Sequence, residues 1–219
     1  MVDLIHGLRA EVVARNLARA REAIAAAGRE PGEVEILAAV KYLPAEELAA
    51  LADGGVTVVG ENRAQELAAK AREASGRFTW DFIGQLQSRK VKEILPHVRY
   101  IHSVASDSAL AQLERHGDRD TQVLVEVNVA GEAGKSGIAP DELPGFLDRC
   151  PVSVVGLMTM PPFTSDPEKS RPHFAALRRL AEAHGLLELS MGTSQDYVVA
   201  AQEGATIVRL GTTLFRDTS

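Results

Sequence analysis

The chain of 219 residues is poor in cysteine, in long apolar runs and in excess positive charge. Its one cysteine, Cys150, excludes an internal disulfide and fits a reducing compartment. No apolar run approaches the roughly 20 residues of a transmembrane helix, and the first residues lack the basic and apolar regions of a signal peptide. A net charge of -6 with both signs interspersed argues against nucleic acid as a partner, and the six histidines lack the spacing of metal ligands. We therefore expect a cytoplasmic protein without a membrane, nucleic-acid or metal partner.

The residues that are present have the composition of an ordinary globular protein, with 45% hydrophobic and 25% charged residues, and we expect one domain over residues 1–219. The segment from Asp3 to about Ala27 is rich in alanine and arginine and has apolar residues at helical spacing before Gly28. This pattern predicts an amphipathic helix near the start of the chain.

Eight β-rich runs then alternate with helical segments, several of which open with the proline, serine or asparagine typical of a helix start. Such alternation predicts βα units around a parallel sheet. Eight units favour a closed (β/α)8 barrel of the TIM type with an extra N-terminal helix, and an open doubly wound sheet is the alternative. The predicted strands are Val34–Val40, Val56–Gly60, Thr79–Ile83, Val98–Val104, Val123–Val129, Val152–Met158, Leu186–Ser190 and Thr206–Leu210.

Lys41 stands where the first of these strands should emerge into a loop. A lysine at the end of a buried strand can serve as a Schiff-base nucleophile, because its amine attacks an aldehyde carbon. The alternative is a lysine that only extends its side chain to water. Since the carboxyl ends of the strands form the active face of a barrel, His102 and Ser103 after the fourth strand and Asn128 at the end of the fifth are expected at the same mouth.

The loops after the seventh and eighth strands have the composition of a phosphate site. Ser194 is placed to cap a helix from Gln195, Gly192 and Gly211 allow the backbone to approach closely, and Thr212 adds a hydroxyl. Barrels commonly hold phosphate at these two loops. Either loop alone could be an ordinary turn. Both together, opposite a strand-end lysine, favour a phosphate-bearing aldehyde as the ligand.

A second string, Gly131–Gly137, ends like a nucleotide P-loop but fails at its start, because Val129 stands where the first glycine is needed. Gly137 and Pro140 also interrupt the helix that a P-loop requires. We interpret this stretch as the irregular loop after the fifth strand.

Several motifs along nearly the whole chain carry a resemblance to one family. They are Ala38–Lys41, Gly60–Glu66, Phe82–Lys90, Ile101–Val104, Val127–Val129, Lys135–Gly137, Gly156–Met158, Leu189–Gly192 and Val208–Thr212. On these motifs the chain resembles the pyridoxal phosphate homeostasis protein family, a one-domain group related to the barrel of fold-type III enzymes such as alanine racemase.

The resemblance implies pyridoxal 5'-phosphate (PLP) as the cofactor and assigns a contact to each matching residue. These contacts are an aldimine to Lys41, the cofactor ring beside Asn62, the pyridine nitrogen facing Arg209, and the phosphate held by Ser194, Gly211 and Thr212. Asp81 departs from the usual family histidine, Thr193 stands where methionine is common, and Tyr42 follows the lysine in place of the usual threonine.

Arg209 also bears on the choice between a carrier and a catalyst. PLP is an effective electron sink when its nitrogen is protonated and paired with a carboxylate, and a guanidinium cannot accept that proton. Racemases of this fold add a second domain, for which a chain that ends at Ser219 has no residues. We predict a monomeric, non-catalytic protein that holds PLP and delivers it to apo-enzymes, with Lys135 as a possible second PLP site. The alternatives are an amino-acid racemase and a cofactor-free barrel for another phosphorylated metabolite.

Overall fold

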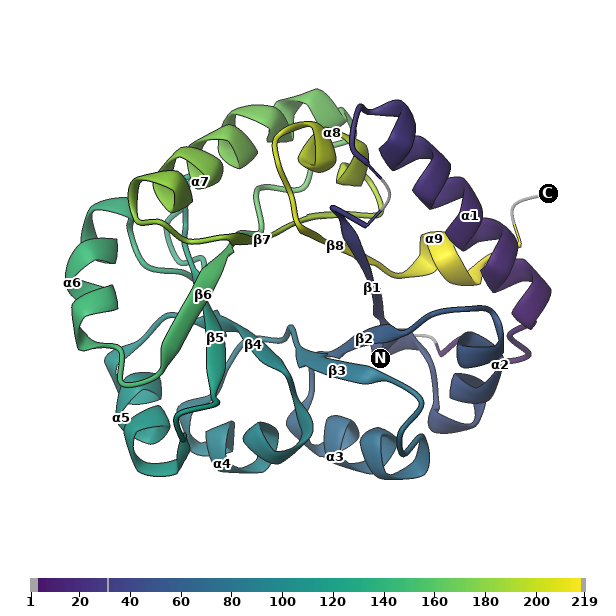
Figure 1. Cartoon of the computed structure of the whole chain (residues 1–219), viewed down its shortest axis with the longest axis horizontal. Helices are drawn as coiled ribbons and strands as arrows, with labels where there is room; N and C mark the ends of the chain where they lie inside the picture. Colours follow the sequence, from purple (N-terminus) through teal and green to yellow (C-terminus); the bar gives the residue numbers. More distant parts are fainter. Residues whose placement is uncertain (1–3, 31, 218–219) are drawn as a thin grey trace.

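The computed structural model describes residues 4–30 and 32–217, which form a closed barrel of parallel strands in sequence order with helices outside it (Figure 1). The predicted (β/α)8 architecture is confirmed, and each strand end lies within three residues of its predicted place. The strands are β1 (Glu35–Ala39), β2 (Val58–Glu61), β3 (Thr79–Phe82), β4 (Tyr100–Val104), β5 (Gln122–Glu126), β6 (Ser153–Met158), β7 (Glu188–Thr193) and β8 (Ile207–Leu210).

A helix follows every strand and packs on the outer face of the barrel (Figure 1). The α-helices are α1 (Ala10–Ala26), α2 (Leu48–Asp53), α3 (Ala64–Glu73), α4 (Val91–Ile94), α5 (Asp107–His116), α6 (Leu143–Arg149), α7 (Arg171–Ala183), α8 (Tyr197–Gln202) and α9 (Thr212–Phe215), joined by the short 3-10 turns η1 (Val40–Tyr42), η2 (Ala45–Glu47), η3 (Ser88–Lys90), η4 (Leu95–His97), η5 (Pro140–Glu142) and η6 (Pro167–Ser170). The segment 127–139 is irregular, as predicted, and no helix starts at its Gly-Lys-Ser.

The first helix starts later than predicted, at Ala10, and the predicted start at Asp3 lies outside the described residues. Gly7 has a positive φ of 71° and interrupts the helical path. The Gly7 and Leu8 amides donate to the Glu47 carboxylate, both at 2.7 Å, and the amide of Ile5 donates to the Tyr42 carbonyl at 2.8 Å. These bonds hold the segment before α1 against the loop that follows β1.

The helix α1 covers the seam of the barrel beside α9, α8 and α2 (Figure 1). Its buried face includes Val13 and Leu17, and the buried Asn16 amide donates to the carbonyls of Leu214 and Arg216. Because α8 and α9 are both short, α1 supplies the apolar cover that these two helices leave open. None of the helices within residues 4–30 and 32–217 has the length and hydropathy to cross a membrane.

Candidate functional site

A cavity of about 550 Å³ opens at the carboxyl end of the strands. We call it the lysine cavity, because Lys41 lines it together with the five other residues predicted to bind the cofactor: Asn62, Ser194, Arg209, Gly211 and Thr212. All six predicted residues therefore line the same cavity. Arg209 belongs to β8 itself, and the other five come from the segments that follow β1, β2, β7 and β8.

Lys41 lies in the turn η1, directly after β1, and its Nζ sits 4.9 Å from the centroid of the Tyr42 ring. Within the described residues its amine has no hydrogen bond or ion pair. The turn itself is anchored from below, because the buried Lys70 of α3 donates to the Val40 carbonyl at 2.9 Å and to Glu61 Oε2 at 2.6 Å. Sequence reasoning missed this second lysine, since a lysine in a helix ordinarily faces water.

The same ion pair reaches the next loop. Glu61 Oε1 accepts hydrogen bonds from the amides of Asn62 and Arg63 at 2.7 and 3.2 Å, so the carboxylate that holds Lys70 also fixes the backbone of Asn62. The Asn62 side-chain Oδ1 is buried and has no hydrogen-bond partner among the described residues. A buried amide oxygen without a partner is costly, so this atom marks a place where a donor belongs.

Arg209 is almost fully buried in β8, and its guanidinium reaches across the barrel to the ends of β6 and β7. Its Nη1 donates to Ser190 O and Oγ at 2.8 and 2.6 Å, and its Nη2 donates to Thr159 O at 2.9 Å and contacts Met160 Sδ. Burial lowers the pKa of Arg209 to about 10, opposed by Glu126, so the group stays cationic at neutral pH. Within the described residues Nε–H has no acceptor and is the donor left for a ligand.

Ser190 continues this contact into a buried polar chain. Because Arg209 donates to Ser190 Oγ, the hydroxyl hydrogen is directed to His102 Nδ1 at 2.8 Å. His102 Nε2–H then donates to Asp81 Oδ2 at 3.1 Å, and Asp81 is bound by Arg99 at 2.7 Å. Burial lowers the pKa of His102, which favours the neutral ring that this arrangement needs.

His102 and Ser103 were expected at the mouth after the fourth strand; Ser103 does line a cavity there, whereas His102 does not. Both lie inside β4, which continues to Val104, so the barrel interior receives the His102 ring. The unusual Asp81 is likewise fully buried below the mouth, where hydrogen bonds to His102 and Arg99 keep its pKa below the usual range despite burial. Asn128 binds the backbone of Glu132 and closes its own loop.

The two predicted phosphate loops meet, but by a different contact from the predicted one. The helix α8 begins at Tyr197, and Asp196 rather than Ser194 occupies its N-cap position. Ser194 Oγ instead accepts a hydrogen bond from the Gly211 amide at 3.3 Å. Gly192 has a positive φ of 90° and a side chain there would meet Ala200, so this glycine serves packing rather than ligand approach.

A second cavity of about 400 Å³ adjoins the first at the mouth. We call it the glutamate cavity, because Glu126 of β5 lines it with Ser103, Lys135 and Ser136. Phe163 and Gln85 line both cavities. Burial raises the pKa of Glu126, opposed by Arg209. Sequence reasoning missed Glu126; an acid directly before the apolar Val127 in a buried strand was the available signal.

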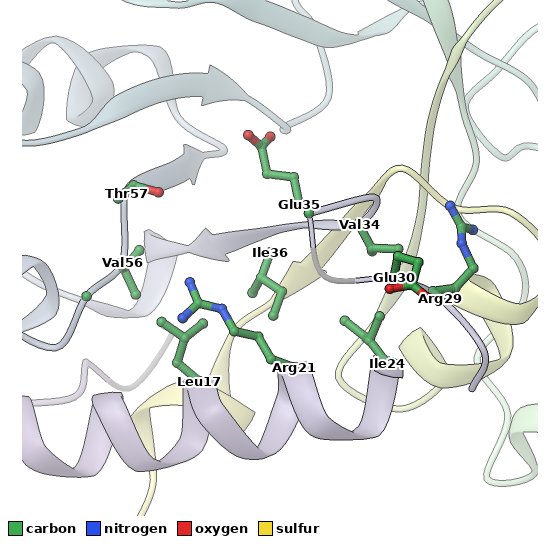
Figure 2. A pocket seen from close by; sticks show the side chains of 12 residues that line it. Leu17, Arg21, Ile24, Arg29, Glu30, Val34, Glu35, Ile36, Val56 and Thr57 are labelled. Carbon is green, nitrogen blue, oxygen red and sulfur yellow. The ribbon is translucent and has the colours of Figure 1, made fainter. Parts of the chain in front are cut away.

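A larger cavity of about 610 Å³ lies at the opposite end of the barrel, between α1 and the amino ends of β1 and β2 (Figure 2). Leu17, Ile24 and Ile36 give it an apolar wall, and the charged Arg21 and Glu35 also line it. None of the predicted site residues lines it. No three His, Cys, Asp or Glu side chains gather as metal ligands anywhere in the part of the chain that the structure describes.

Comparison with known proteins decides the family. A pyridoxal phosphate homeostasis protein of Aquifex aeolicus is 38% identical over 221 residues, which cover 94% of this chain and 97% of that protein. The structure of PipY of Synechococcus elongatus PCC7942, with PLP bound, is 31% identical with a TM-score of 0.79 and covers 93% of this chain and 100% of that chain. This chain belongs to the pyridoxal phosphate homeostasis protein family. The resemblance drawn from the sequence motifs is thus confirmed.

The relation to racemases holds at the level of fold. Alanine racemase of Corynebacterium glutamicum matches with a TM-score of 0.71 and 14% identity over 94% of this chain and 60% of the racemase. No protein-family model matches the chain.

Proposed function

We propose that this protein binds PLP in the lysine cavity, covalently through Lys41, and that it carries the cofactor rather than catalysing a reaction with it. The observation that carries the proposal is the convergence of a free strand-end amine, an orphaned Asn62 amide, a fixed guanidinium and two hydroxyls on one cavity. Curated relatives that share most of the chain are named for PLP homeostasis, and PipY is described with PLP bound.

The side chains suit the parts of the cofactor. Lys41 Nζ is free to bond the aldehyde carbon, Asn62 Oδ1 awaits a donor beside the ring, and Arg209 Nε–H is available to the pyridine nitrogen. Ser194, Thr212 and the Gly211 backbone would hold the phosphate, because hydroxyls and exposed amides at a helix start suit an anion. PLP itself would supply an aldehyde reactive toward amines and an electron-poor ring.

The environment of Arg209 supports the proposed carrier role. Its four Nη donors already contact Ser190, Thr159 and Met160, so the guanidinium cannot swing away to admit a carboxylate. A cation facing the pyridine nitrogen leaves that nitrogen unprotonated and weakens the electron sink. Action as a single-domain monomer in the cytoplasm, delivery to apo-enzymes and a second PLP molecule at Lys135 stay predictions.

The experiment is spectroscopic. Purified protein should be yellow, and borohydride reduction followed by peptide mapping should place the modification on Lys41. Lys41→Ala should abolish it, whereas Lys70→Arg, which keeps a cation under the turn, should load normally. A colourless protein that PLP cannot reconstitute, or a modification on another lysine, would contradict the proposal.

The hypothesis that the protein carries PLP without catalysis is tested separately from PLP binding. Loaded protein incubated with alanine or serine in heavy water should exchange the α-proton slowly at most. Racemisation near the roughly 1–10³ s⁻¹ of ordinary enzymes would instead establish the racemase alternative.

A further inference from the structure

The glutamate cavity contains a buried carboxylate that the fold does not use. The structure describes four buried acids, and three of them are hydrogen-bonded: Glu61 to Lys70, Asp81 to Arg99 and His102, and Asp196 to the Thr193 amide. Glu126 is the fourth. Its side chain is 7% exposed, lines the cavity, and has no hydrogen bond or ion pair with any described residue.

A buried acid without a partner calls for a donor or a cation from outside the chain. The charge of Arg209 acts on Glu126, but all the Nη contacts of Arg209 go to other groups and none goes to Glu126. A metal ion is poorly served, because no further His, Cys, Asp or Glu joins Glu126 in a ligand group within the described residues. A protonated primary amine needs one carboxylate and a few hydroxyls or carbonyls, and the cavity offers Glu126 and Ser103.

Another residue that lines the same cavity has the opposite charge. Lys135 is about half exposed, and its closest acid, Glu132, is 4.0 Å away. The Ser136 hydroxyl is not hydrogen-bonded to any described residue. The apolar side chains of Met158 and Phe163 also line this cavity. The cavity thus combines an anion, a cation and an apolar wall in about 400 Å³.

We propose that the glutamate cavity binds a free amino acid with an apolar side chain, with the ammonium group at Glu126 and the carboxylate at Lys135 and Ser136. The cavity shares Ile83, Gln85 and Phe163 with the lysine cavity, so the ligand would lie next to the bound cofactor. A second PLP molecule fits less well, because its phosphate would add negative charge beside Glu126. The inference deepens the proposed function but does not need PLP to be present for its test.

Norleucine is the probe, and pentylamine and hexanoate are the same molecule without its carboxylate or its amine. Chemical-shift titration of ¹⁵N-labelled protein, first without cofactor and then loaded and reduced with borohydride, should show norleucine binding in both forms. Glu126→Gln should weaken norleucine and pentylamine about tenfold or more and leave hexanoate unchanged, whereas Lys135→Gln should weaken norleucine and hexanoate only. Asp141→Asn, an exposed acid outside the cavity, is the charge-matched control.

Folding of each variant is checked by circular dichroism, and Glu126→Gln should fold because it removes a buried charge without a partner. Norleucine that fails to bind, or that binds Glu126→Gln as tightly as the wild type, overturns the inference. Capture of a second cofactor on Lys135 by borohydride overturns it as well. Visible absorption of the loaded protein is recorded before the borohydride step, so failure of PLP loading counts against the proposed function alone.

Discussion

Replacing Asp81 by asparagine tests the row of buried hydrogen bonds that runs from Arg209 through Ser190 and His102 to Asp81. Asp81 is fully buried and accepts four hydrogen bonds: from Arg99 Nε and Nη2 at 3.1 and 2.7 Å, from the Tyr100 amide at 3.2 Å, and from His102 Nε2 at 3.1 Å. Asparagine can keep one oxygen for Arg99 Nε and Tyr100. Its NH₂ group, however, meets Arg99 Nη2 and His102 Nε2–H as donor against donor.

The loss can be worked from these contacts. Two hydrogen bonds to a charged acceptor contribute roughly 1.5–3 kcal/mol each, and removal of one partner from a buried ion pair costs about 3–5 kcal/mol. We expect Asp81→Asn to lower the free energy of unfolding by about 3–5 kcal/mol, because Arg99 retains only its pair with Glu35 at 2.6 Å. For a chain of this size the melting temperature should fall by about 6–20 °C.

The assay is urea and thermal unfolding, each followed by circular dichroism. Asp120→Asn, an exposed acid paired only with the exposed Arg119, is the control and should change nothing measurable. A loss below about 1 kcal/mol in Asp81→Asn would refute the reasoning, because ordinary surface changes already reach half that value. Asp81 would then not be an ionised partner of Arg99.

Three further outcomes are expected. Ser194→Ala and Thr212→Ala should each weaken PLP on the order of tenfold to a hundredfold but leave phosphate-free pyridoxal nearly unaffected; equal losses for both ligands would give these residues a structural role. His102→Gln should flatten the fall in stability between about pH 7 and pH 5, because burial lowers the pKa of the folded-state histidine below 6.5 and the unfolded chain takes up the proton first; an unchanged pH profile would contradict this. Lys70→Met should cost about 3–5 kcal/mol in unfolding and also weaken PLP titrated by absorption, since Val40 loses its anchor; unaltered PLP affinity would separate the ion pair from the site.

The barrel could be predicted from the sequence because each strand is buried on both faces. Strands of this kind appear as short apolar runs, such as Val123–Val129, with helix signals between them. The strand ends were less accurate at β5, which stops at Glu126 rather than Val129, and at β7, which continues through polar residues to Thr193 rather than Ser190. A polar side chain inside a barrel cannot be recognised from one strand, because its partners come from other strands.

The same limit explains which residues of the candidate site could be predicted from the sequence and which could not. Lys41, Arg209 and Thr212 could be assigned to one cavity because each lies within two residues of the carboxyl end of a strand. Barrel geometry brings such positions together. Lys70 and Glu126 could not, because their importance depends on contacts or cavities built from distant segments. Ser194 was placed at the right cavity for an incomplete reason: its hydroxyl binds Gly211 across two loops instead of capping the following helix.

The buried row of hydrogen-bonded side chains from Arg209 to Arg99 also bears on the proposed carrier role. A catalyst needs a group near the ring that can take up or release a proton near neutral pH. Arg209 is a fixed cation, and Ser190 relays its hydrogen bond to a His102 ring that burial keeps neutral. Asp81 is the one carboxylate in this row of hydrogen-bonded side chains. It is bound to Arg99 and keeps its charge, so this row has no proton to pass toward the ring. In the proposed binding mode these groups secure the orientation of Arg209 behind the ring nitrogen, and a fixed donor there favours retention of the cofactor over the chemistry that PLP can support.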